Sequence, residues 1–167
     1  MTIRLLILGT LFVFAGGCTG GLDPEAIPGE AKIFGTVTYT GDLHRWPPPD
    51  SIVDLRVVAF QEVPEKITDI AEALANGRLF FSSQTLDRNV SSSGYLLTIP
   101  NAPVTLRYIA LVQLYSTNLS RDWRFLGVYT AGGSSHGPSV LQVKPGATYS
   151  GIDITVDFSK LPPQPSK

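Results

Sequence analysis

Two histidines are the side chains in this sequence best suited to acid–base chemistry near neutral pH. His44 precedes a Trp-Pro-Pro-Pro run, and His136 lies in the Gly/Ser/Pro-rich segment 132–138. A nucleophilic site needs a histidine base beside a serine or cysteine, and zinc needs about three protein ligands at characteristic spacing. Neither pattern is evident around these two residues. We therefore expect two solvated loop histidines, no catalytic residues, no metal ligands and no cofactor.

Paired carboxylates are the second arrangement that could do chemistry. Asp153 and Asp157 lie four residues apart in a segment whose residues alternate between apolar and polar. Along a strand this spacing places them about 13 Å apart. That distance is too long for one metal ion or for the acid pair of a glycosidase. We expect both carboxylates on a solvated outer face.

Aromatic side chains provide a third kind of candidate site. Trp46 stands beside three consecutive prolines, and Trp123, Phe125 and Tyr129 follow later in the chain. Such rings can stack on sugars, but more often they fill a core or cover one end of a sandwich. For Trp46 both interpretations stay open, since a loop flanked by prolines is difficult to bury. Trp46 and His136 are therefore the candidate ligand-binding residues.

Cys18, the only cysteine, ends an N-terminal segment with the layout of a secretory signal. Arg4 is its only charge, and the apolar run that follows has about 11 residues, against roughly 20 needed to span a bilayer. Residues 15–18, Ala-Gly-Gly-Cys, resemble the lipobox of bacterial lipoproteins, although Ala15 stands where leucine is usual. The resemblance implies cleavage before Cys18 and lipid attachment to its thiol. The alternative is an ordinary signal cleaved at an A-x-A-like site, which would leave an unpaired thiol.

Composition limits the remaining chain to a single β-rich domain without disulfides. The 167 residues carry a net charge of −1, and no cluster of Lys and Arg indicates a nucleic-acid partner. We assign residues 1–17 to the signal and 18–30 to a flexible tether. Residues 31–159 form the domain, and 160–167 are expected to be a disordered tail.

Short apolar runs separated by Gly, Pro and Ser predict an all-β sandwich of about seven to eight strands. Residues 54–60 read as a central strand covered on both faces, because the run is almost continuously apolar. A helical pattern occurs only at 64–76, and we expect this short inserted helix to lie across a sheet edge or end. The predicted strands are 33–39, 54–60, 79–86, 95–99, 106–115, 123–129, 140–143 and 152–158.

The order of these segments resembles the immunoglobulin-like β-sandwich of transthyretin-like or carboxypeptidase-regulatory-like domains. The matching residues are 33–37, 94–100, 108–113 and 143–149, within 31–159. Members of that group are mostly non-catalytic modules for folding support, adhesion or partner contact. The resemblance thus implies a structural or protein-interaction module.

Together, the two resemblances predict a non-catalytic protein that is exported and lipid-anchored in a bacterial cell envelope. Thr19 after Cys18, rather than Asp, would permit sorting to an outer membrane if the cell has one. We expect contact with the membrane through the lipid, an envelope protein as partner, and no nucleic acid. The alternative function is a carbohydrate-binding module that holds a polysaccharide at the cell surface, and a hydrolase ranks third.

Overall fold

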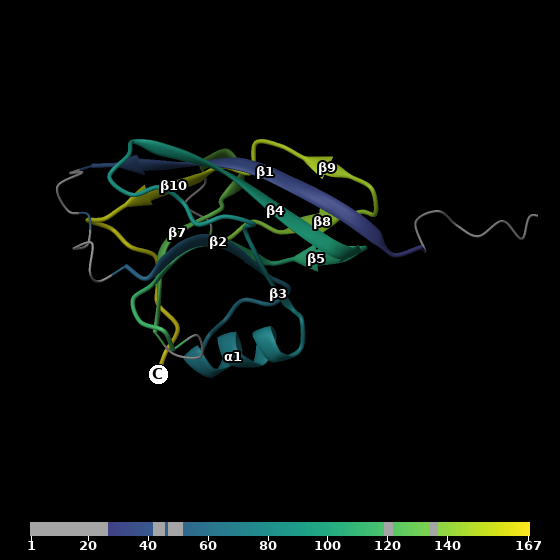
Figure 1. Cartoon of the computed structure of the whole chain (residues 1–167), viewed down its shortest axis with the longest axis horizontal. Helices are drawn as coiled ribbons and strands as arrows, with labels where there is room; N and C mark the ends of the chain where they lie inside the picture. Colours follow the sequence, from purple (N-terminus) through teal and green to yellow (C-terminus); the bar gives the residue numbers. More distant parts are fainter. Residues whose placement is uncertain (1–26, 42–45, 47–51, 119–121, 134–136) are drawn as a thin grey trace, which may run out of the picture.

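Two β-sheets packed face to face, with one helix below the second sheet, make up the domain (Figure 1). The structure is a computed structural model, and it describes residues 27–41, 46, 52–118, 122–133 and 137–167. The domain is therefore an all-β sandwich with one short α-helix, as predicted. The elements are β1 (Gly29–Thr40), β2 (Asp54–Phe60), α1 (Ile67–Ala75), β3 (Leu79–Phe81), β4 (Ser92–Ala102), β5 (Val104–Leu106), β6 (Tyr108–Leu114), β7 (Trp123–Val128), β8 (Leu141–Val143), β9 (Thr148–Tyr149) and β10 (Ile154–Asp157).

The first sheet is built around β1, whose residues alternate between the core and solvent. Its strand order is β10-β1-β4, and β9 also pairs with β1. β4 runs antiparallel to β1, whereas β9 and β10 run parallel to it. β4 continues through Pro100, where we expected it to stop. Proline is tolerated on an edge strand because its missing N–H would face outward.

The second sheet has the strand order β3-β2-β6-β7 and buries both of its faces. The predicted central position of 54–60 is confirmed, since β2 has a neighbour on each side and is covered on both faces. Two short strands that the sequence did not predict, β5 and β9, lie at the same end of the sandwich (Figure 1). β5 pairs with β8 in a separate two-stranded sheet.

The main core lies between the two sheets. Along one side the edge strands β7 and β10 approach closely, because Gly127 has no side chain. A Cβ atom at Gly127 would lie 2.7 Å from the carbonyl oxygen of Thr155. This core consists mainly of aliphatic side chains and includes Ile33, Val37, Leu55, Val57, Leu97, Ile99, Ile109, Leu111, Leu126, Ile154 and Val156.

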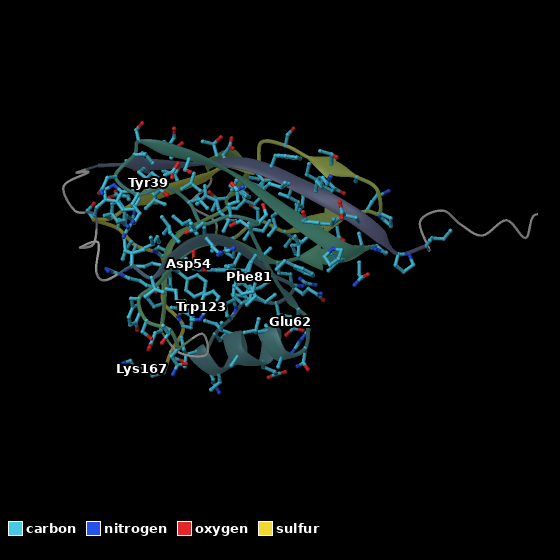
Figure 2. All side chains as sticks on the ribbon, in the orientation of Figure 1. Tyr39, Asp54, Glu62, Phe81, Trp123 and Lys167 are labelled. Carbon is cyan, nitrogen blue, oxygen red and sulfur yellow. The ribbon has the colours of Figure 1, made fainter. Side chains whose placement is uncertain are left out.

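A second, aromatic cluster lies on the other face of the second sheet, under α1. Ile70 is the buried residue of the helix and packs into this cluster. Figure 2 shows Phe81 and Trp123 on the side of the sheet that faces the helix, and their ring centroids lie 5.8 Å apart. The expected position across a sheet edge or end is therefore wrong: the helix lies over a face, next to β3, because the apolar outer face of the sheet needs a cover.

The C-terminal segment packs onto the domain, whereas the sequence predicts a disordered tail at 160–167. The Gln164 amide accepts a hydrogen bond from the N–H of Phe125 and donates one to its carbonyl, both at 2.9 Å. Ser166 pairs with the backbone of Glu65 and Ile67 at the start of α1. The Gln164 side chain thus pairs with the outward backbone groups of Phe125 on the edge strand β7. The sequence did not indicate this contact, because the segment contains few apolar residues. At the other terminus, β1 starts at Gly29, inside the predicted tether.

Candidate functional site

A groove of about 790 Å³ runs along the edge of β4. Its lining comes from residues 34–36 of β1, residues 93–96 of β4 and the segment 83–87. Gly151 and Asp153, just before β10, complete the lining. The groove therefore extends from the outer edge of the first sheet across β4 and β1.

Tyr95 of β4 holds the floor of the groove in place. Its side chain passes over β1 at Gly35. Tyr95 lies opposite Gly35 and donates a 2.5 Å hydrogen bond to the carbonyl of Ile152. A Cβ atom at Gly35 would lie 2.0 Å from that carbonyl oxygen and 2.7 Å from the Tyr95 ring. Burial, with a smaller contribution from the Asp153 carboxylate, raises the pKa of Tyr95. The phenol is thus a neutral structural donor and unsuited to proton transfer.

Backbone hydrogen bonds determine which groups of β4 face outward. The Thr36 N–H donates to Asp153 Oδ1 at 2.8 Å, and the N–H of Ile152 donates to the Phe34 carbonyl at 3.3 Å. Even-numbered residues in this part of β1 therefore direct their backbone groups away from β4. Gly94 is paired with Thr36, so the pair exchanges no ladder hydrogen bond. The N–H and C=O of Gly94 consequently point to the outer edge of the sheet.

A neighbouring segment covers only part of this edge. Ser83 donates from its N–H to the Leu96 carbonyl at 3.0 Å, and Ser82 forms a bridge with Leu97. The chain then turns away, and the N–H of Leu86 donates to Leu55 in β2 at 2.7 Å. Within the part of the chain that the structure describes, no hydrogen-bond partner reaches Gly94 from this side. No heavy atom lies within 4 Å of the position of a Cβ at Gly94, so the groove is open there.

The chemistry of the groove favours binding over catalysis. Its lining contains two carboxylates, Asp87 and Asp153, with serine, threonine and glutamine side chains, and no Lys, Arg or His. Among the described residues, no group of three or more His, Cys, Asp or Glu side chains is placed to hold a metal ion. The groove therefore presents hydrogen-bond acceptors and negative charge to a ligand. The sequence signal for the groove was the presence of Gly35 and Gly94 in or beside predicted strands. A glycine in a strand often marks a place where another segment approaches the backbone closely.

The candidate residue Trp46 lies at one end of the sandwich, packed against other aromatic rings. Its ring centroid is 4.6 Å from that of Tyr39 and 4.9 Å from that of Phe158. The indole is half-buried, and its buried N–H has no hydrogen-bond partner among the described residues. Trp123 and Phe125 are buried in the cluster under α1, and Tyr129 packs partly buried against the main core. These rings contribute packing in the structure, and none of them lines the groove.

His44, His136 and Cys18 lie outside the described residues. Residues 133–137 spell Gly-Ser-Ser-His-Gly, so the spacing of a nucleophile elbow is present around His136, contrary to our interpretation of the sequence. Such an elbow joins a strand directly to a helix. Here a 3-10 turn, Ala131–Gly133, precedes the segment, and the next element is the strand β8. The match therefore lacks the structural context of that motif.

Trp46 and Tyr129 lie toward opposite ends of the sandwich. Trp46 packs against Tyr39, whose N–H donates a hydrogen bond to the Ser91 carbonyl. The same segment, 86–91, also bonds to Leu55 at the start of β2. Tyr129, where the connection with His136 begins, instead bonds to Ile109. Ile109 is paired with Ala59, at the far end of β2. Trp46 therefore lies toward the end of the sandwich opposite to Tyr129, and His136 itself is outside the described residues.

These features define the class of the protein as an all-β sandwich with a polar groove at one sheet edge. No protein-family model, curated protein or solved structure matches the chain. No helix in the described part of the chain has the length and apolar character needed to cross a bilayer.

Proposed function

We propose that this chain is a lipid-anchored, non-catalytic protein of the bacterial cell envelope that binds a protein partner. The observation that carries the proposal is the sequence at its N-terminus: a charge, a short apolar run, and then Ala15-Gly16-Gly17-Cys18. Several acyl chains together anchor a protein stably to a membrane. In a cell with two membranes, Thr19 is compatible with sorting to the outer one.

The interaction role is supported by the kind of site the domain offers. The groove at β4 presents open backbone groups and acceptor side chains, which are suited to recognition. A transthyretin-like or carboxypeptidase-regulatory-like topology within the sandwich is part of the proposal, and such modules generally support or contact other proteins. Function rests on the site rather than on the fold alone.

The carbohydrate-binding alternative has less support. It relies on Trp46 as a stacking platform, and this ring packs against both Tyr39 and Phe158 with its N–H buried. A sugar platform needs an accessible ring face. No observation favours this alternative over a protein partner.

Metabolic labelling with palmitate tests the anchor. We expect the full chain, produced in a bacterium with a lipoprotein pathway, to incorporate label and to fractionate with membranes. Cys18→Ala should lose both properties, whereas Thr19→Ala should keep them. Label that persists in Cys18→Ala, or wild-type protein without label, would overturn the anchor.

Crosslinking in cells tests the interaction role. We expect one dominant envelope protein to crosslink to the wild-type chain, and its yield to fall when Gly35→Ala destabilises the domain. Retention of polysaccharide without any protein partner would overturn the proposal in favour of the glycan-binding module.

A further inference from the structure

The edge of β4 is open at Gly94. β3 and Ser82–Ser83 line this edge as far as Leu96, and the chain then leaves toward β2. Beyond that point the outward N–H and C=O of Gly94 have no partner among the described residues. Exposed edges of this kind are templates for pairing with another chain.

We propose that a partner protein docks an extended, basic segment in this groove, adding a strand to β4 at Gly94. This inference rests on the proposed function and names the chemistry of the partner. The stretch of edge from Ser92 to Leu96, where Ser83 already occupies the carbonyl, is about 14 Å long at ~3.4 Å per residue, which suits a short extended peptide. Backbone pairing at Gly94 would supply affinity, and side-chain contacts would supply specificity.

Charge complementarity is the reason for a basic segment. Asp87 lines the groove on the outer side of β4, and Asp153 lines it on the far side of β1. Asp153 is exposed and uses Oδ1 for the Thr36 N–H. No lysine or arginine lines the groove to offset these carboxylates. Basic side chains of a docked segment would therefore find a carboxylate on either side of the groove.

Gly94 is also the position at which a long side chain can pass over the strand. An added strand directs alternate side chains to opposite faces of the sheet. Because Gly94 has open space where a Cβ would be, such a side chain can lie across β4 toward Thr36 and Asp153. Phe34 and Leu96, a cross-strand pair that also lines the groove, offer apolar contact to its methylene groups.

The test is an NMR titration of the ¹⁵N-labelled full chain, purified in detergent, with acetyl-(Lys-Val)₃-amide. We expect the amide signals of Ser92 and Gly94 to shift, and hydrogen exchange at the Gly94 N–H to slow. The acidic peptide acetyl-(Glu-Val)₃-amide and an N-acetylglucosamine tetramer should leave these signals unchanged. Shifts caused by the sugar and not by the basic peptide would overturn the inference in favour of a glycan, as would equal binding of both peptides.

Variants separate backbone pairing from charge. Gly94→Pro removes the outward N–H without removing a ladder bond to β1, and we expect about fivefold weaker binding. Gly94→Ala keeps the N–H, so it should bind more tightly than Gly94→Pro, although its Cβ fills part of the open space at this position. Asp153→Asn keeps an oxygen for Thr36 and should weaken binding about two- to fivefold. Glu65→Gln, outside the groove, is the matched charge control.

Wild-type affinity in both Gly94→Pro and Asp153→Asn would overturn the inference. If Gly94→Pro does not fold, Asp153→Asn against Glu65→Gln decides it alone. Photocrosslinkers placed at Ser93 and at Glu65 in cells separate the two proposals. A partner captured only from Glu65 would overturn the groove and leave the proposed function standing, whereas no partner from any position would overturn the proposed function.

Discussion

Gly35 is the residue that allows three chain segments to meet at the floor of the groove. Its neighbours are the Ile152 carbonyl, before β10, and the Tyr95 ring from β4. The tyrosine covers the gap left by the missing side chain and bridges the strands on either side of β1. Any side chain at this position would have to displace a backbone carbonyl, which cannot rotate away as a flexible side chain could.

Gly35→Ala should therefore destabilise the domain strongly. We expect a loss of about 2–3 kcal/mol or more in the free energy of unfolding, measured by urea denaturation. Gly94→Ala is the matched control, because nothing lies within 4 Å of its Cβ position in the next strand. Equal unfolding midpoints for the two variants would contradict the close contact at Gly35.

At the scale of elements, the C-terminal segment joins an edge strand to a helix. Gln164 reproduces with one amide the two hydrogen bonds that a neighbouring strand would make with Phe125. Ser166 accepts a hydrogen bond from the Ile67 N–H, one of the donors that a helix N-terminus leaves unsatisfied. Asp69 accepts two more, from the N–H groups of Glu65 and Lys66. The segment thus protects β7 and fixes the start of α1.

Gln164→Ala should loosen β7 and α1 together. We expect about 1–2 kcal/mol lower stability and faster hydrogen exchange at the N–H groups of Phe125 and Ile67. Gln164→Glu should also be impaired, since a carboxylate accepts from Phe125 but donates nothing to its carbonyl. Lys167→Ala serves as the control. Unchanged exchange at Phe125 in Gln164→Ala would show that the amide does not protect this edge.

At the scale of the whole molecule, three buried phenols couple stability to alkaline pH. Burial, together with the Asp87 carboxylate, raises the pKa of Tyr39. Burial and the Asp153 carboxylate raise that of Tyr95, and burial alone raises the pKa of Tyr108 to about 12. Tyr39 and Tyr95 belong to the core between the sheets, while Tyr108 belongs to the cluster under α1. Both cores are therefore sensitive to ionisation.

The free energy of unfolding should fall as pH rises from about 10 to about 12. Above the ordinary tyrosine pKa of 10.0 the unfolded chain releases phenolic protons that the folded chain keeps, so stability decreases with pH. Each tyrosine contributes up to about 1.4 kcal/mol per pH unit in that window. Urea unfolding at a series of pH values measures the slope, and Tyr108→Phe should make it shallower. An identical slope in Tyr108→Phe would contradict the contribution of that phenol.

The sequence predicted the elements where local pattern and burial agree. The alternation in 33–39 identified β1, and the continuous apolar run at 54–60 identified a central strand with two covered faces. Pro64 and the apolar spacing from Ile67 to Leu74 identified the helix, though not the face that it covers. These predictions succeeded because a period of two or 3.6 residues directly reflects which side of an element meets the core.

Other features depend on partners that are distant in sequence. The segment 160–167 appeared disordered, because its contacts are hydrogen bonds to residues distant in sequence, such as that of the Gln164 amide with an edge strand 39 residues away. The groove arises where Ser83 leaves β4, where Gly94 faces outward and where Asp153 crosses β1. The register and the order of the strands determine each of these three features.

By itself the sequence determined the class of fold, the strand and helix periods, and an N-terminus typical of an exported, lipidated chain. Only the tertiary structure decided which edge stays open, which glycines carry close contacts and where the C-terminal segment binds. Local periodicity is fixed by neighbours three or four residues away. Edge exposure and close packing are instead fixed by segments that meet only after the sheets have formed.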